Sequence, residues 1–225
     1  MYDFPKRLEL VFKRFDKHKL LLKPSKCRFG LSKVEFCGRV VSKEGISMSD
    51  KKISQVLAFP LPVYFKQLKS FLGLANYFRP HVRNHSEVAR PLHAMLENYS
   101  RGRLLQWTPA LEASFHELQR LISDCPTMRF VDPDEELFVY TDASDYGIGG
   151  YCFQIEKGEE VPVAFVSKSL SESQLRWATI QKEAYGIFFT CKELDPLLRD
   201  RHFVLRTDHK NLLFIKENSN PMIIR

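Results

Sequence analysis

The chain has 225 residues, of which 44% are hydrophobic and 27% are charged. This composition is typical of a globular protein and excludes a disordered, collagen-like or coiled-coil chain as a first interpretation. No apolar run reaches the roughly 18 residues that a membrane helix needs, and no secretion or other targeting signal is visible at the N-terminus. We therefore expect one large domain or two small ones, in an intracellular protein of the cytoplasm or nucleus with no membrane partner.

The five cysteines are scattered and odd in number, which indicates reduced thiols inside a cell rather than a disulfide framework. None of their spacings is typical of a zinc ribbon or a redox motif. We expect them to be small buried apolar residues. They are Cys27, Cys37, Cys125, Cys152 and Cys191.

Net charge is divided unevenly along the chain. Residues 1–105 hold 21 basic and 8 acidic residues, whereas residues 106–225 hold 13 basic and 19 acidic residues. The basic half could neutralise phosphates, and the acidic half could hold divalent cations on carboxylate oxygens. Solvated faces with no polyanion partner are the alternative.

The first half of the sequence predicts helices and one β-hairpin. Helical spacing of apolar residues, with Ser49 and Thr108 as caps and Pro109 at a first helical position, supports the helices. A turn near Gly30 would close the hairpin. The predicted ranges are a helix over 5–21, a hairpin over 26–42, and helices over 49–59, 65–78, 86–96 and 109–123.

The second half predicts a mixed sheet with helices packed against it. Apolar runs of strand length alternate with one long helical pattern, and we place a domain boundary near residues 99–107. The predicted ranges are strands over 127–131, 137–141, 147–155, 161–167 and 202–206, a helix over 179–194 and a short helix over 209–215.

Three carboxylates stand where they could share a cation. Asp142 and Asp208 each follow an apolar strand pattern, and Glu183 lies in the first turns of the helix between them. A carboxylate at a buried strand is costly unless it is compensated. Three such groups could hold two Mg²⁺ ions for in-line phosphodiester cleavage; helix capping and solvated surface acids are the alternatives.

Other features favour plainer interpretations. Gly147, Gly149 and Gly150 open no predicted helix, so they indicate close packing of a strand rather than a phosphate-binding loop. Asp145 lies in a predicted turn and is expected to be structural. No serine or cysteine nucleophile with a partnered histidine stands out.

One helix of the basic half could follow a nucleic-acid backbone. It combines cations, an amide and an aromatic ring that could contact phosphates and stack on a sugar or base. The alternative is an amphipathic helix with a solvated face. These candidate nucleic-acid-binding residues are Lys66, Lys69, Asn76, Tyr77 and Arg79.

Seven ordered motifs cover nearly the whole chain. They are KCRF (26–29), VEFCGRVVS (34–42), FLGLANYFR (71–79), ARPL (89–92), YTDAS (140–144), KE (182–183) and TDHK (207–210). In this order they resemble the reverse transcriptase thumb and ribonuclease H region of gypsy-type LTR retrotransposon polyproteins.

The resemblance implies a palm-end helix and hairpin over residues 1–48, a helical thumb-like region over 49–106, and a ribonuclease H-like domain over 107–225. It implies an α+β or α/β fold in which a small helical domain precedes a mixed sheet. Asp142, Glu183 and Asp208 would be the catalytic residues and the ligands of Mg²⁺, with Mn²⁺ as an alternative. The substrate would be an RNA–DNA hybrid, whose RNA strand is cut, and residues 49–97 would help to bind it by shape, phosphates and the 2′-hydroxyl.

The chain also departs from the family pattern. It contains no Asp-Asp pair and therefore no Tyr-x-Asp-Asp polymerase motif, so we expect no DNA synthesis, with fingers and most of the palm as partners in a parent polyprotein. The family's fourth acid follows Asp208 on a later helix, so the domain is expected to be truncated at both ends and its nuclease activity weak or absent. The alternative function is a non-catalytic remnant that binds RNA–DNA duplex through the basic half.

Overall fold

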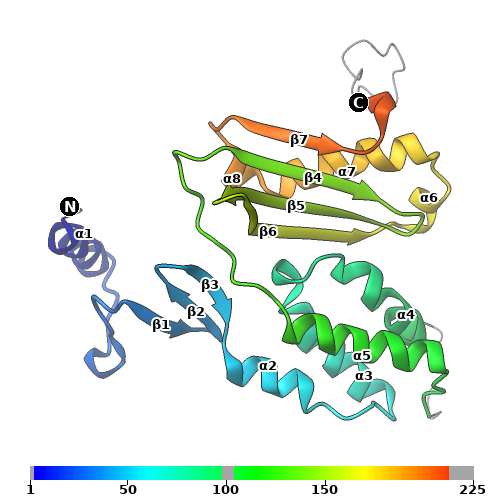
Figure 1. The fold of residues 1–225 in the computed structure, drawn as a ribbon. Helices are drawn as coiled ribbons and strands as arrows, with labels where there is room; N and C mark the ends of the chain where they lie inside the picture. The colour runs from blue at the N-terminus through cyan, green and yellow to red at the C-terminus, as the bar shows by residue number, and fades with distance from the viewer. Residues whose placement is uncertain (1–2, 98–103, 213–225) are drawn as a thin grey trace. The chain divides into compact units, whose positions relative to one another are not determined.

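The computed structural model describes residues 3–97 and 104–212 (Figure 1). The helices of this part are α1 (Phe4–Lys17), α2 (Asp50–Leu57), α3 (Phe65–Asn76), α4 (His85–Glu97), α5 (Pro109–Ser123), α6 (Glu172–Leu175), α7 (Thr179–Glu193) and α8 (Asp195–Leu198). The strands are β1 (Lys33–Phe36), β2 (Arg39–Ser42), β3 (Gly45–Met48), β4 (Leu137–Ala143), β5 (Gly147–Glu156), β6 (Glu159–Ser169) and β7 (Phe203–Thr207). Short 3₁₀ turns are η1 (Pro24–Lys26), η2 (Arg79–His81) and η3 (Lys210–Leu212).

By its internal contacts the chain divides into two compact units, Met1–Lys33 and Val34–Arg225. The first unit holds α1 and η1. Phe12 of α1 meets Phe29 edge-on, with ring centroids 5.7 Å apart, and α1 has no buried residue. The helix predicted over 5–21 is confirmed but ends earlier, at Lys17.

The first sheet has the order β1-β2-β3. A hairpin joins β1 to β2, but the predicted turn near Gly30 is wrong. The chain turns instead at Cys37 and Gly38, whose φ angles of 51° and 75° suit the two-residue turns that match strand twist. Gly30 also has a positive φ of 67°, but it bends the chain before the first strand begins.

The strand predicted over 127–131 is wrong. Only Met128 pairs with the sheet, in an isolated bridge to Ile46 with both N–H···O distances at 2.8 Å. This approach depends on Gly45, where a Cβ atom would stand 2.1 Å from the Met128 carbonyl oxygen. The segment is therefore a connection that touches the first sheet at one residue.

Helices α2 to α5 enclose one apolar core, as their amphipathic patterns predict. Phe71 lies at its centre, 4.4 Å from Phe115 and 5.4 Å from Phe59 between ring centroids. Gln119 of α5 is buried, and its side-chain amide donates to the Val56 carbonyl at 2.9 Å. Thus α5 packs with the helices that precede it. The domain boundary predicted between residues 106 and 107 places α5 in the same domain as the second sheet, and that boundary stays a prediction.

The second sheet has the order β6-β5-β4-β7, with β4 parallel to β7 and the other pairs antiparallel (Figure 1). Helix α7 packs on one face of it. Close packing by the glycines of β5 is confirmed: a Cβ on Gly150 would lie 2.5 Å from the Thr190 side chain of α7, and one on Gly149 would lie 2.7 Å from the Asn84 side-chain oxygen. The missing side chain of Gly150 lets α7 sit close to β5, and that of Gly149 makes room for Asn84, which precedes α4.

Two short helices, α6 and α8, were not predicted, because four residues are too few to show a helical period. The short helix predicted over 209–215 falls partly outside the described residues. Within them, η3 covers the first part of that range. Within the part of the chain that the structure describes, no helix is long and apolar enough to cross a membrane. All five cysteines are free, but only Cys152 is fully buried.

Candidate metal centre

Asp142 and Asp208 are brought together by the register of two parallel strands. Thr141 of β4 pairs with Thr207 of β7, so the residue after each threonine lies at the same edge of the sheet. The apolar runs before both acids make the strands, and the parallel pairing places the two carboxylates side by side. Sequence patterns predicted the strands, and the structure supplies the register.

Glu183 reaches the same edge from the first half of α7. A Cβ on Gly186 would lie 3.6 Å from the Ile148 side chain and 3.9 Å from the Asp142 carbonyl oxygen, so this turn of the helix packs at ordinary contact distance from the strands. The backbone N–H of Ala143 donates to the Glu183 carboxylate. Glu183 is therefore fixed to the end of β4, next to Asp142.

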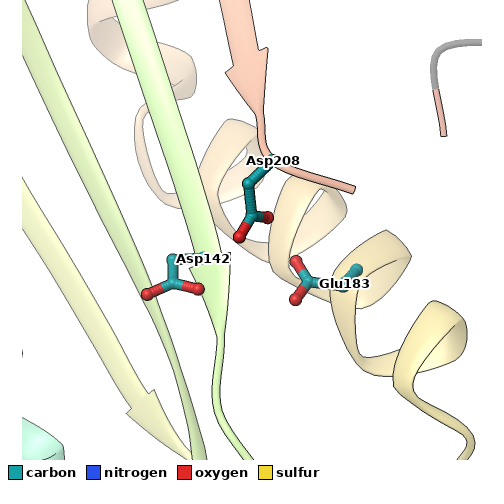
Figure 2. Close-up of side chains that lie close together, drawn as sticks. All are labelled: Asp142, Glu183 and Asp208. Atoms are coloured by element: carbon teal, nitrogen blue, oxygen red, sulfur yellow. The ribbon is translucent and has the colours of Figure 1, made fainter. Parts of the chain in front are cut away.

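The three carboxylates form one cluster. Each offers an oxygen that lies within 4.8 Å of an oxygen from the other two. Figure 2 shows the side chains converging from β4, α7 and the end of β7. Glu183 is buried, with 5% of its surface exposed, whereas Asp142 and Asp208 are exposed. The cluster thus has a closed inner side and an open outer side.

The environment disfavours the charged form of Glu183. Burial, and then the charges of Asp208 and Asp142, raise the pKa of Glu183 to about 7, against a small opposing effect of the Ala143 N–H. Its Oε2 atom is buried without a hydrogen-bond partner among the described residues. A buried carboxylate oxygen with no donor is costly, and a cation would compensate it.

The donor set fits a hard divalent cation. Carboxylate oxygens are the ligands that Mg²⁺ and Mn²⁺ prefer, and three of them converge with one oxygen unpartnered. Asp142, Glu183 and Asp208 are therefore the residues that could hold such an ion.

The five candidate nucleic-acid-binding residues have different surroundings. Lys66, Lys69 and Asn76 are exposed on α3. Tyr77 donates its hydroxyl to the Cys37 carbonyl, and its ring lies near the cations of Arg39 and Lys52 at 5.5 and 5.7 Å. The Arg79 guanidinium donates to the Ser167 carbonyl of β6. Their role on nucleic acid stays a prediction.

Three of these five residues line one open groove of about 650 Å³. Lys69, Asn76 and Arg79 contribute to it from α3 and η2, and its other polar lining residues are His85, Ser86, His93, Glu97, Lys168 and Ser169. Lys66 and Tyr77 are not among the lining residues. Sequence reasoning missed His93 and Lys168 because they belong to segments read only as an amphipathic helix and a strand.

A match to a protein-family model covers the second sheet and its helices. Residues 132–225 match the model described as "RNase H-like domain found in reverse transcriptase". This part of the chain is similar to the RNase H-like domain of reverse transcriptases.

Relatives of the whole chain are polyproteins of mobile elements. It is 29% identical over 224 residues to the retrovirus-related Pol polyprotein from transposon opus of Drosophila melanogaster, covering 96% of this chain and 22% of that protein. It is 27% identical over 216 residues to that from transposon 297 of the same fly, covering 95% and 20%. It is 28% identical over 211 residues to the Tf2-3 polyprotein of Schizosaccharomyces pombe, covering 92% and 16%. These relatives are consistent with an LTR retrotransposon polyprotein, and the chain spans about a fifth of their length.

Solved structures share the fold. The foamy viral protease-reverse transcriptase in complex with RNA/DNA hybrid superposes with a TM-score of 0.75 at 20% identity, covering 98% of this chain and 30% of that one. The same enzyme in complex with dsDNA gives a TM-score of 0.73 at 21% identity, covering 98% and 46%. The predicted fold class, a helical part followed by an RNase H-like mixed sheet, is confirmed.

Proposed function

We propose that the RNase H-like domain hydrolyses the RNA strand of RNA–DNA hybrids with Mg²⁺, or Mn²⁺ in its place, held by Asp142, Glu183 and Asp208. The observation that carries this proposal is the convergence of three carboxylates from β4, α7 and the end of β7. The chain lacks any Asp-Asp pair, so the proposal includes no DNA synthesis.

The buried carboxylate and the two exposed carboxylates would have different roles. Divalent cations, when bound, activate an attacking water and stabilise the leaving oxygen of a phosphodiester. Glu183 closes the inner side of the site and keeps bulk water from it. Asp142 and Asp208, on the open side, face the solvent from which a scissile phosphate would arrive, and their negative charge excludes that phosphate unless cations intervene.

The proposed substrate class draws on two further observations. The groove offers three cations, Lys69, Arg79 and Lys168, against one acidic residue, Glu97, and residues 1–105 carry most of the positive charge. A foamy viral relative of the same fold is described in complex with RNA/DNA hybrid. We accordingly assign residues 49–106 a thumb-like role in holding the hybrid, and fingers and palm of a parent polyprotein as further partners.

The test is cleavage of a hybrid by the full chain. With the RNA strand end-labelled, the account predicts slow shortening of the RNA in Mg²⁺, in keeping with the weak activity expected from the sequence, intact RNA in EDTA, and intact DNA in both. Asp142→Asn removes one ligand charge and should abolish cleavage, whereas Asp132→Asn, in an exposed loop, should leave it unchanged. Cleavage that persists in Asp142→Asn, or intact RNA with the unaltered chain, would refute the nuclease proposal.

A second candidate function is a module that binds hybrid without cutting it. The groove and the basic first half favour it independently of the carboxylates. It predicts binding that weakens by orders of magnitude as salt rises, that persists in Asp142→Asn, and that yields no shortened RNA. Binding that is absent or insensitive to salt would contradict this candidate.

A further inference from the structure

Lys182, the residue before Glu183, has an unusual place. It lies near the start of α7, where a cation opposes the helix dipole, and only 7% of its side chain is exposed. Its Nζ donates to the backbone carbonyl of Asp145 at 3.3 Å and to Asp145 Oδ1 at 3.2 Å. A buried charge at an unfavourable helix end is costly. The two contacts with Asp145 compensate this cost for the Lys182 ammonium group.

Those contacts join the two elements that carry neighbouring carboxylates. Asp145 belongs to the turn after β4, three residues beyond Asp142. The turn is itself ordered by Ser144, whose Oγ accepts from the Gly147 N–H at 3.1 Å. Lys182 thus holds an ordered turn of the β4–β5 connection against the start of α7.

Two hydrogen-bonded attachments join α7 to the end of β4 and the turn after it. The Ala143 N–H donates to Glu183, and Lys182 holds Asp145. The first depends on the ligand itself. Lys182 is the attachment that uses no ligand atom and can resist the mutual repulsion of Asp142 and Glu183.

We propose that Lys182 is a positioning residue for the metal centre: its ammonium group, through the turn at Asp145, holds Asp142 and Glu183 at a spacing that binds a divalent cation. It touches neither ion nor substrate. The inference rests on the proposed function, since it assumes that the three carboxylates bind a cation. Residues that orient metal ligands typically change metal affinity 10–100-fold when substituted, and Lys182 acts one contact away from the ligands.

The experiment measures Mg²⁺ binding by the full chain as the rise in unfolding temperature with Mg²⁺ concentration. Lys182→Met keeps the length of the side chain and removes its donors. It should raise the Mg²⁺ concentration at half effect about tenfold, and Lys182→Arg should restore most of the affinity. Lys192→Met, an exposed lysine near the other end of α7, is the matched control and should leave the affinity unchanged.

A purely structural role would lower the unfolding temperature in EDTA and leave the half-effect concentration unchanged, and this result would overturn the inference. If Lys182→Met does not fold, Asp145→Ala replaces it in the test. Asp145→Ala removes the carboxylate acceptor of Lys182 and keeps the backbone acceptor, so it should weaken Mg²⁺ binding in the same direction but by less. An unchanged Mg²⁺ affinity would overturn the inference. Asp142→Asn separates the two claims: if the unaltered chain gains no stability from Mg²⁺, or gains as much as Asp142→Asn, the proposed metal centre fails and this inference fails with it.

Discussion

Removing the charge of Glu183 should stabilise the metal-free chain at alkaline pH. Burial and two neighbouring carboxylates raise the pKa of Glu183 to about 7 from an ordinary value of 4.5. The folded chain therefore keeps a proton that the unfolded chain releases. The resulting stability is fully present below pH 4.5 and is lost as the pH rises through 7.

The size of the effect follows from the shift. A difference of about 2.5 pKa units at about 1.36 kcal/mol per unit gives about 3 kcal/mol for a side chain that is 5% exposed. The variant Glu183→Gln keeps the shape and cannot ionise. In EDTA its free energy of unfolding should equal that of the unaltered chain at pH 4 and exceed it by about 3 kcal/mol at pH 8.

Urea unfolding in EDTA across this pH range measures the difference. Glu193→Gln, at the exposed end of the same helix, is the control and should show no gain that grows with pH. Mg²⁺ should stabilise the unaltered chain at pH 8 and should stabilise Glu183→Gln far less. A difference between Glu183→Gln and the unaltered chain that stays flat from pH 4 to pH 8 would refute the reasoning.

Three further predictions concern packing and binding. Gly150→Ala places a Cβ 2.5 Å from Thr190 and should lower the free energy of unfolding by about 1–3 kcal/mol. Gly73→Ala, in open space on α3, should raise the free energy of unfolding by about 0.5–1 kcal/mol. Equal effects of the two variants in urea unfolding would contradict the packing described. Gln119→Ala removes an amide that donates to three backbone carbonyls and should cost about 1–3 kcal/mol in the same assay, so a neutral result would argue against the bonds. Lys69→Ala should reduce the slope of log affinity for RNA–DNA hybrid against log salt by about one, and an unchanged slope would place Lys69 outside the interface.

Local patterns in the sequence were sufficient for most elements and for the three carboxylates. Apolar runs before Asp142 and Asp208 predicted β4 and β7, and the helical spacing around Glu183 predicted α7. The parallel pairing of β4 with β7 lies beyond such patterns, because it depends on contacts between residues more than 60 positions apart. That pairing turns three candidate acids into one cluster.

Predictions from the sequence failed where two local signals competed or where a side chain meets a partner far along the chain. Gly30 and Gly38 both favour a turn, and β1 lies between them, so the hairpin that joins β1 to β2 closes at Gly38. Arg79 was predicted to contact phosphate, but the sequence could not indicate that its guanidinium meets the Ser167 carbonyl. Lys182 was passed over because its partner in the turn is 37 residues away.

The most direct measurement of the central claim is the location of a bound cation. Anomalous scattering from a crystal of the full chain grown with Mn²⁺ should show a peak in contact with carboxylate oxygens of Asp142, Glu183 and Asp208. A map from such a crystal with no peak among these three side chains, at a Mn²⁺ concentration that supports hybrid cleavage by related nucleases, would contradict the metal centre on which the proposed function depends.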